Sequence, residues 1–240
     1  MCYQSKHDIL IVVEHYQKIV NPGSSKLLND FSPHEPFIMT ISGKIITLSA
    51  TLLVVMVFSL PIGAATKMTD QTKQHTAYLS GGCFWGMEEL VREIPGVHQT
   101  EVGYTGGHTP NARYEQVSTG KTGHAESLKV VFDPQRLSYR HLLFEFFRMH
   151  NPTTRNQQGN DIGTQYRSAI FYTDEEQKRV AAEVIKAVDA SGEWKGRIVT
   201  ELVPFKEFFR AEEYHQKYLV KNRGGYTCHY MRHFDLGETK

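Results

Sequence analysis

The 240-residue sequence has little cysteine, almost no net charge and no internal repeat. Its three cysteines are too few for a framework of disulfides or for a zinc cluster held by cysteines alone. With 27 Lys and Arg against 26 Asp and Glu, the net charge of +1 disfavours a nucleic-acid-binding protein that works through a basic patch. The hydrophobic content of 40% is ordinary for folded proteins and excludes wholesale disorder.

The longest uncharged apolar run, IITLSATLLVVMVFSL at 45–60, lies close to the N-terminus. It is shorter than the ~20 residues that a membrane-spanning helix needs. Lys44 precedes the run, and small residues ending at Ala65 follow it. A positive flank, a short apolar stretch and a small-residue tail are typical of a secretory signal peptide.

Met39 offers a start codon that gives this signal a normal length. We therefore interpret 1–65 as an N-terminal extension and signal peptide that is cleaved after Ala65, and 66–75 as a polar linker. The protein is then expected to be exported to the periplasm. The alternative is an uncleaved segment that anchors it in the inner membrane.

Residues 76–240 contain no break in composition and are predicted to form one domain. Thr173 is the expected cap of the longest helix, and Ser138 of another. Strands and helices alternate unevenly, which favours an α+β sandwich over a doubly wound sheet. Strands are predicted at 76–80, 97–104, 125–132, 168–172 and 198–203, and helices at 84–93, 138–149, 173–190 and 211–222.

The most informative segment places Cys83 after two glycines, where a strand ends and a helix begins. Backbone N–H groups at a helix N-terminus stabilise an anion, so we expect the thiol to have a lowered pKa and high reactivity. Phe84 and Trp85 would give the sulfur an apolar wall. The alternative, a buried and inert cysteine in an aromatic core, stays open.

Glu126 lies at the start of an alternating strand, on the same face as Leu128, Val130 and Phe132. If that face points inward, the carboxyl lies in apolar surroundings that raise its pKa and suit it to proton donation. A strand-end carboxylate that points to water is the alternative.

The loop 159–167 gathers amides, Asp161 and Tyr166, a composition found in functional loops and in ordinary solvated ones. Cys228 follows two glycines and is either a second thiol that swings towards Cys83 or an unrelated cysteine. Export to an oxidising compartment indicates a pair. The twelve histidines contain no zinc-binding motif, so no metal is predicted.

Two enzyme classes use such a cysteine. A cysteine protease would pair Cys83 with His215 or His229 as base, since both lie ~130–150 residues downstream. The papain-type signature fails, because Phe84 separates the cysteine from the tryptophan and Ser80 stands where a second cysteine is required. A thiol redox enzyme needs a reactive cysteine, an acid and a second cysteine, and all three are present. A binding module does not explain the two thiols.

Five segments together resemble the A-type peptide-methionine sulfoxide reductases in order and spacing, and the resemblance covers 76–232. These segments are 82–86 (GCFWG), 103–107 (GYTGG), 123–126 (GHAE), 159–168 (GNDIGTQYRS) and 214–216 (YHQ). The resemblance implies a two-layer α+β sandwich with a ferredoxin-like core and an irregular C-terminal tail. It also implies reduction of methionine-(S)-sulfoxide, free or in proteins, and hence protein repair.

The resemblance further assigns roles to single residues. It makes Cys83 the nucleophile, which becomes a sulfenic acid, and Glu126 the general acid. Cys228 would resolve the sulfenic acid as a Cys83–Cys228 disulfide. This sequence departs from many relatives, whose tail carries one or two recycling cysteines, because no further cysteine follows Cys228 here. The substrate would be bound by Phe84, Trp85, Tyr114, Asp161 and Tyr166.

The expected partners are a thioredoxin-like reductant and oxidised proteins or free methionine sulfoxide. We expect no cofactor, no nucleic acid and a monomer. Since the cytosolic thioredoxin pool does not reach an exported protein, a periplasmic or membrane-linked donor is predicted.

Overall fold

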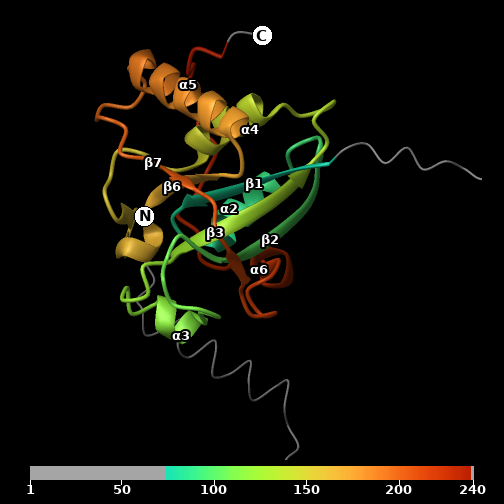
Figure 1. Ribbon diagram of the computed structural model, residues 1–240, viewed down its shortest axis with the longest axis vertical. Helices are drawn as coiled ribbons and strands as arrows, with labels where there is room; N and C mark the ends of the chain where they lie inside the picture. The colour runs from blue at the N-terminus through green and yellow to red at the C-terminus, as the bar shows by residue number, and fades with distance from the viewer. Residues whose placement is uncertain (1–73, 239–240) are drawn as a thin grey trace, which may run out of the picture. The chain divides into compact units, whose positions relative to one another are not determined.

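The computed structural model describes residues 74–238 (Figure 1). The expected extension, signal peptide and cleavage site, and nearly all of the linker, lie outside these residues. No helix within the described part of the chain is long and apolar enough to cross a membrane.

A six-stranded sheet forms the centre of the fold, with the strand order β7-β6-β1-β3-β2-β8 (Figure 1). A separate two-stranded hairpin joins β4 to β5. The strands are β1 (His75–Gly81), β2 (Val97–Thr105), β3 (Ala125–Phe132), β4 (Gln157–Gln158), β5 (Asp161–Ile162), β6 (Ser168–Tyr172), β7 (Glu201–Pro204) and β8 (Phe208–Arg210). The helices are α2 (Phe84–Val91), α3 (Tyr114–Val117), α4 (Tyr139–Met149), α5 (Glu175–Ser191) and α6 (Tyr218–Lys221), and Thr164–Tyr166 is a 3-10 turn.

The core confirms the predicted α+β class. Its chain order, β1-α2-β2-β3-α4-β6, and its antiparallel pairings are those of a ferredoxin-like fold. Helices α2 and α4 contact each other and both contact β1, so they form the second layer. Beyond this core, β7 pairs parallel to β6 after α5, and β8 pairs antiparallel to β2.

The sequence forms these elements for local reasons that the burial pattern shows. Strand β3 alternates as predicted, and Leu128, Val130 and Phe132 are fully buried together on its inner face. Helix α4 buries Leu142 and Phe146 against the sheet. The predicted Ser138 cap is confirmed, since its hydroxyl accepts a hydrogen bond from the backbone of the first turn at 3.1 Å.

Two helix predictions need correction. The cap of α5 is Asp174 rather than Thr173, because the Asp174 backbone is extended and its carboxylate accepts the N–H of Gln177 at 2.8 Å. The helix predicted at 211–222 reduces to α6, because Lys217 adopts a left-handed backbone with φ 53° that interrupts any longer helix.

Smaller differences concern the second half of the chain. The strand expected at 198–203 forms as β7, and β8 was not predicted. The loop at 151–165 contains the β4–β5 hairpin. This hairpin and the tail after α6 both approach the turn between β1 and α2.

Candidate active site

Cys83 occupies the predicted turn between β1 and α2, as the residue that precedes the first turn of the helix. Gly82 makes the turn possible, because its φ of 102° is an angle that residues with a side chain rarely adopt. The Cys83 carbonyl accepts the N–H of Met87 at 3.4 Å. The cysteine is 7% exposed, so the sulfur lies at the start of the helix in a nearly closed environment.

Glycine also lets two distant segments close on this turn. A β-carbon at Gly82 would lie 2.5 Å from the side chain of Gln158, which belongs to the β4–β5 hairpin. A β-carbon at Gly86 would lie 2.3 Å from Thr227, in the C-terminal tail. Both distances are shorter than a van der Waals contact. A larger residue at Gly82 or Gly86 would therefore prevent these segments from packing here.

Glu126 points inward, and the water-facing alternative is wrong. The residue is 3% exposed, and its Oε2 accepts a hydrogen bond from the backbone N–H of Phe84 at 3.1 Å. Burial raises the pKa of Glu126 to about 8, the charge of Asp161 adds to the rise, and the Phe84 N–H works against it. The carboxyl next to Cys83 is therefore mostly protonated at neutral pH.

The expected lowering of the Cys83 pKa is contradicted. Burial raises the pKa of the thiol well above its ordinary value, and the charges of Glu126 and Asp161 act in the same direction. The backbone N–H of Trp85 opposes this rise, as expected of a helix N-terminus, but does not outweigh the loss of solvent. The resting site thus contains a neutral thiol beside a neutral carboxyl.

Tyr114 and Tyr166 come from α3 and the 3-10 turn and meet at this pair of groups. Burial raises the pKa of both phenols, and the charges of Glu126 and Cys83 raise them further. Both therefore keep their protons and are available as hydrogen-bond donors. The structure places both tyrosines near Cys83 and Glu126, and the roles that the resemblance implies for them stay predictions.

Aromatic residues follow Cys83 directly in the chain and line the site beside it. Phe84 and Trp85 are buried, and the Trp85 indole stacks on Tyr218 with ring centroids 3.7 Å apart. The indole N–H donates to Nδ1 of His215 at 3.0 Å, and the His215 ring lies 5.0 Å from that of Phe84. Tyr218 was not predicted, because its segment was interpreted as one regular helix.

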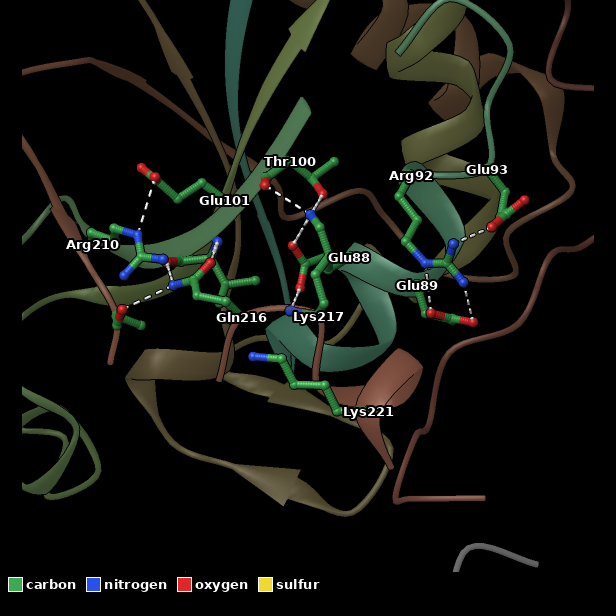
Figure 2. A network of polar contacts seen from close by, with 12 residues as sticks. Glu88, Glu89, Arg92, Glu93, Thr100, Glu101, Arg210, Gln216, Lys217 and Lys221 are labelled. Atoms are coloured by element: carbon green, nitrogen blue, oxygen red, sulfur yellow. Dashed lines mark hydrogen bonds and ion pairs between the residues drawn. The ribbon is translucent and has the colours of Figure 1, made fainter. Parts of the chain in front are cut away.

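An ion pair between the buried Glu88 and the half-exposed Lys217 fixes the segment that carries His215 and Tyr218 (Figure 2). Glu88 of α2 accepts hydrogen bonds at 2.7 Å from both the backbone N–H and the ammonium group of Lys217. The same ammonium donates to the carbonyl of Thr100 at 2.8 Å. The sequence could have indicated this pair, because Glu88 is the one acidic residue on the buried side of α2.

Asp161 and Cys228 lie next to each other at the edge of the site. Asp161 Oδ2 accepts a hydrogen bond from the hydroxyl of Tyr226 at 3.1 Å and lies 3.5 Å from Cys228 Sγ. Both Cys83 and Cys228 are in the thiol form. The charge of Cys228 contributes to the raised pKa of Cys83, which places the tail cysteine close to the first one.

The two histidines considered as protease bases do not serve Cys83. His215 uses Nδ1 to accept from Trp85, and burial lowers its pKa to about 3. His229 bonds the carbonyl of Gly81 through Nε2 at 2.7 Å. Among the described residues, neither histidine makes a hydrogen bond to Cys83. Within 74–238, no group of three or more His, Cys, Asp or Glu side chains is arranged to hold a metal ion.

Comparison with known proteins gives one consistent result. A family model described as peptide methionine sulfoxide reductase matches residues 75–239. The peptide methionine sulfoxide reductase MsrA of Streptomyces coelicolor is 54% identical over 165 residues, which are 69% of this chain and 92% of that protein. MsrA 1 of Mesorhizobium japonicum is 55% identical over 161 residues, 67% of this chain and 91% of that protein.

Two solved structures agree with the sequence matches. Mxr1 from Saccharomyces cerevisiae in reduced form is similar with a TM-score of 0.64 and 39% identity, covering 68% of this chain and 94% of that one. Methionine sulfoxide reductase A of Corynebacterium diphtheriae is similar with a TM-score of 0.59 and 39% identity, covering 66% of this chain and 79% of that one.

Proposed function

Because this chain belongs to the peptide methionine sulfoxide reductase family, we propose that Cys83 takes the oxygen from methionine-(S)-sulfoxide, free or in proteins. The enzyme is an oxidoreductase that reduces methionine sulfoxide and so repairs oxidised proteins. The observation that carries the finer proposal is the buried carboxyl of Glu126, which accepts the backbone N–H of Phe84 next to Cys83 and whose pKa is raised to about 8 by burial.

The first step needs both an acid and a nucleophile. The Cys83 sulfur attacks the sulfoxide sulfur and forms an S–S bond. The protonated oxygen then shifts from the substrate sulfur to Cys83 as the S–O bond of the substrate and the new S–S bond break, which leaves Cys83 as a sulfenic acid. Methionine leaves with the substrate sulfur reduced and Cys83 oxidised. An oxide is a poor leaving group unless it is protonated, and Glu126 can supply that proton because burial keeps it neutral. The thiol proton restores the acid, so the step is neutral overall.

The raised pKa of Cys83 fits this order of events. A neutral thiol is a weak nucleophile, so the buried sulfur is protected from chance oxidants until a substrate arrives. The sulfoxide oxygen then accepts a proton from Glu126, and the thiol proton has a place to go. Nucleophile and acid are therefore activated by the same substrate atom.

The contrast between the two walls of the site gives a physical basis for choosing one epimer. The sulfoxide sulfur carries an oxygen, a methyl group and a longer carbon chain in a fixed handedness. The phenols of Tyr114 and Tyr166 suit the oxygen, and the rings of Phe84 and Trp85 suit the methyl group. The opposite epimer would put its oxygen against the rings, where it finds no donor of this kind.

The second step regenerates the enzyme. Cys228 attacks the Cys83 sulfenic acid, water leaves and a Cys83–Cys228 disulfide forms. A thioredoxin-like dithiol then reduces this disulfide. The proposal is supported by the position of Cys228 in a tail that packs on the Cys83 turn.

Single-turnover kinetics with separated sulfoxide epimers test this proposal. We expect pre-reduced enzyme to form one methionine per chain from the S epimer, and none at a comparable rate from the R epimer. A Cys83→Ser variant should form none from either epimer. Equal rates for both epimers would contradict the assignment of the walls, and methionine formed by the Cys83→Ser variant would contradict the nucleophile.

A further inference from the structure

His229 makes a different hydrogen bond through each of its two ring nitrogens. Nε2 lies 2.7 Å from the carbonyl oxygen of Gly81, in the strand that leads to Cys83. A carbonyl oxygen can only accept, so Nε2 carries the ring proton. The other nitrogen, Nδ1, is then a bare acceptor, and it lies 3.7 Å from the sulfur of Cys228. The Gly81 bond therefore selects the tautomer that can receive the Cys228 proton.

The ring is held rigidly in this position. His229 is buried, and a β-carbon at Gly86 would lie 2.6 Å from its Nδ1, so the ring sits directly on the first turn of α2. Burial lowers the pKa of His229 to about 4, the Gly81 bond works against this, and the charge of Arg232 adds to it. At neutral pH the imidazole is therefore uncharged and Nδ1 is unprotonated, although the same burial makes it a weaker base than a histidine in water.

A carbonyl and a carboxylate also lie near the Cys228 sulfur. One is the carbonyl of Gln158 at 3.6 Å, which is not a base. The other is Asp161 Oδ2 at 3.5 Å, and that oxygen also accepts from the hydroxyl of Tyr226. This carboxylate oxygen is therefore already engaged by another donor. His229 Nδ1 has the further advantage that its protonation leaves a cation next to the new thiolate.

We propose that His229 is a catalytic residue of the second step, where it takes the proton of Cys228 as that sulfur attacks the Cys83 sulfenic acid. The inference rests on the proposed function. The S–S bond forms, the S–O bond of Cys83 breaks, and the departing hydroxide takes the proton from Nδ1 and leaves as water. The Cys83 sulfur is reduced and the Cys228 sulfur is oxidised, so no other reactant is required.

The test uses a substitution that separates the base from the hydrogen bond. In His229→Gln the amide nitrogen can still donate to Gly81, but no basic nitrogen faces Cys228. His233→Gln makes the same change at an exposed histidine of the same tail and serves as the control. Pre-reduced enzyme is mixed with methionine-(S)-sulfoxide. Methionine, sulfenic acid (trapped with dimedone) and the Cys83–Cys228 disulfide are then followed in time.

The measured quantity is the rate of disulfide formation divided by the rate of methionine formation in the same variant. We expect this ratio to fall by at least ~10-fold in His229→Gln, since a general base contributes 10²–10⁴-fold, and sulfenic acid to accumulate. In His229→Gln the disulfide step should also accelerate with rising pH, as ionisation of Cys228 replaces the lost base. His233→Gln should keep the wild-type ratio and pH profile.

A wild-type ratio in His229→Gln would overturn the inference, because the Cys228 proton would then leave without this imidazole. Failure of the proposed function looks different, because the wild-type enzyme itself would then form no methionine or no Cys83–Cys228 disulfide. Disulfide formation in the wild type together with an unaltered His229→Gln variant would therefore contradict only the role of His229.

Discussion

The Glu126→Gln substitution should make the protein more stable while removing its activity. In the folded protein the pKa of Glu126 is about 8, against an ordinary value of 4.5. Between these values the folded state keeps a proton that the unfolded state releases, so stability falls as the pH rises through this interval. Glutamine does not ionise in either state and avoids this loss. Its side-chain oxygen can still accept the hydrogen bond from Phe84.

The size of the effect follows from the distance between the pH and the ordinary pKa. At pH 7 that distance is 2.5 pH units, and each unit corresponds to about 1.4 kcal/mol, so the variant should gain about 3 kcal/mol in free energy of unfolding. At pH 5 the gain should be below about 1 kcal/mol. Above pH 8 it should level off near about 5 kcal/mol.

Urea unfolding of wild type and variant at pH 5, 7 and 9 measures this difference. Every other titrating group is shared by the two proteins, so the change in their difference with pH isolates Glu126. The methionine burst should be lost in the variant at every pH. A stability difference that does not change with pH, or a variant that is less stable at pH 7, would refute the buried and protonated carboxyl.

Three further predictions concern turnover and the support of the site. With dithiothreitol as reductant, the wild-type rate should fall as the pH rises through about 8, because Glu126 loses its proton; a rate that rises through this interval contradicts the acid role. Lys217→Ala leaves the Glu88 carboxylate buried without its cation. Breaking a buried pair costs about 3–5 kcal/mol, and the lysine side chain is 39% exposed, so urea unfolding should show a loss of about 2–3 kcal/mol. Lys221→Ala serves as the control, because the lysine is equally exposed at 40% but its partner Glu213 is 74% exposed. It should change the free energy of unfolding by less than about 0.5 kcal/mol, and equal losses in both variants would contradict the importance of the buried Glu88 partner. Cys228→Ser should form one methionine per chain but lose turnover driven by thioredoxin, and unchanged multiple turnover would exclude Cys228 as the resolving thiol.

Local sequence patterns predicted the parts of the site that belong to single elements. The alternation in β3 placed Glu126 on the same face as Leu128 but left open whether that face points inward, and the structure shows that it is buried. Two glycines before Cys83 predicted a sharp turn into a helix, which α2 confirms. Both features depend on neighbours in the chain, so the sequence alone carried the information.

The pKa of Cys83 could not be predicted in this way. The sequence shows a helix N-terminus, which lowers a thiol pKa, but it does not show which distant segments exclude water from the sulfur. The tail near Thr227 and the hairpin at Gln158 close on the turn from far along the chain. Their effect on solvation outweighs that of the helix end and reverses the expected shift.

The backbone of the segment 211–222 was also mispredicted because of a contact that is distant in the chain. Its composition is typical of a helix, yet Lys217 adopts a left-handed conformation because Glu88, far away in the chain, binds both its backbone N–H and its ammonium group. That tertiary contact places Tyr218 on Trp85. The signal peptide stays a prediction, which N-terminal sequencing of exported protein would test by finding Thr66 first.

The mass of Cys83 after one turnover tests the central claim most directly. A Cys228→Ser variant is reduced, mixed with methionine-(S)-sulfoxide labelled with ¹⁸O, trapped at once with acid, digested and analysed by mass spectrometry. The account predicts one added oxygen, carrying the label, on the peptide that contains Cys83. Methionine formed without an oxygen gained at Cys83, or with the label on another residue, would contradict it.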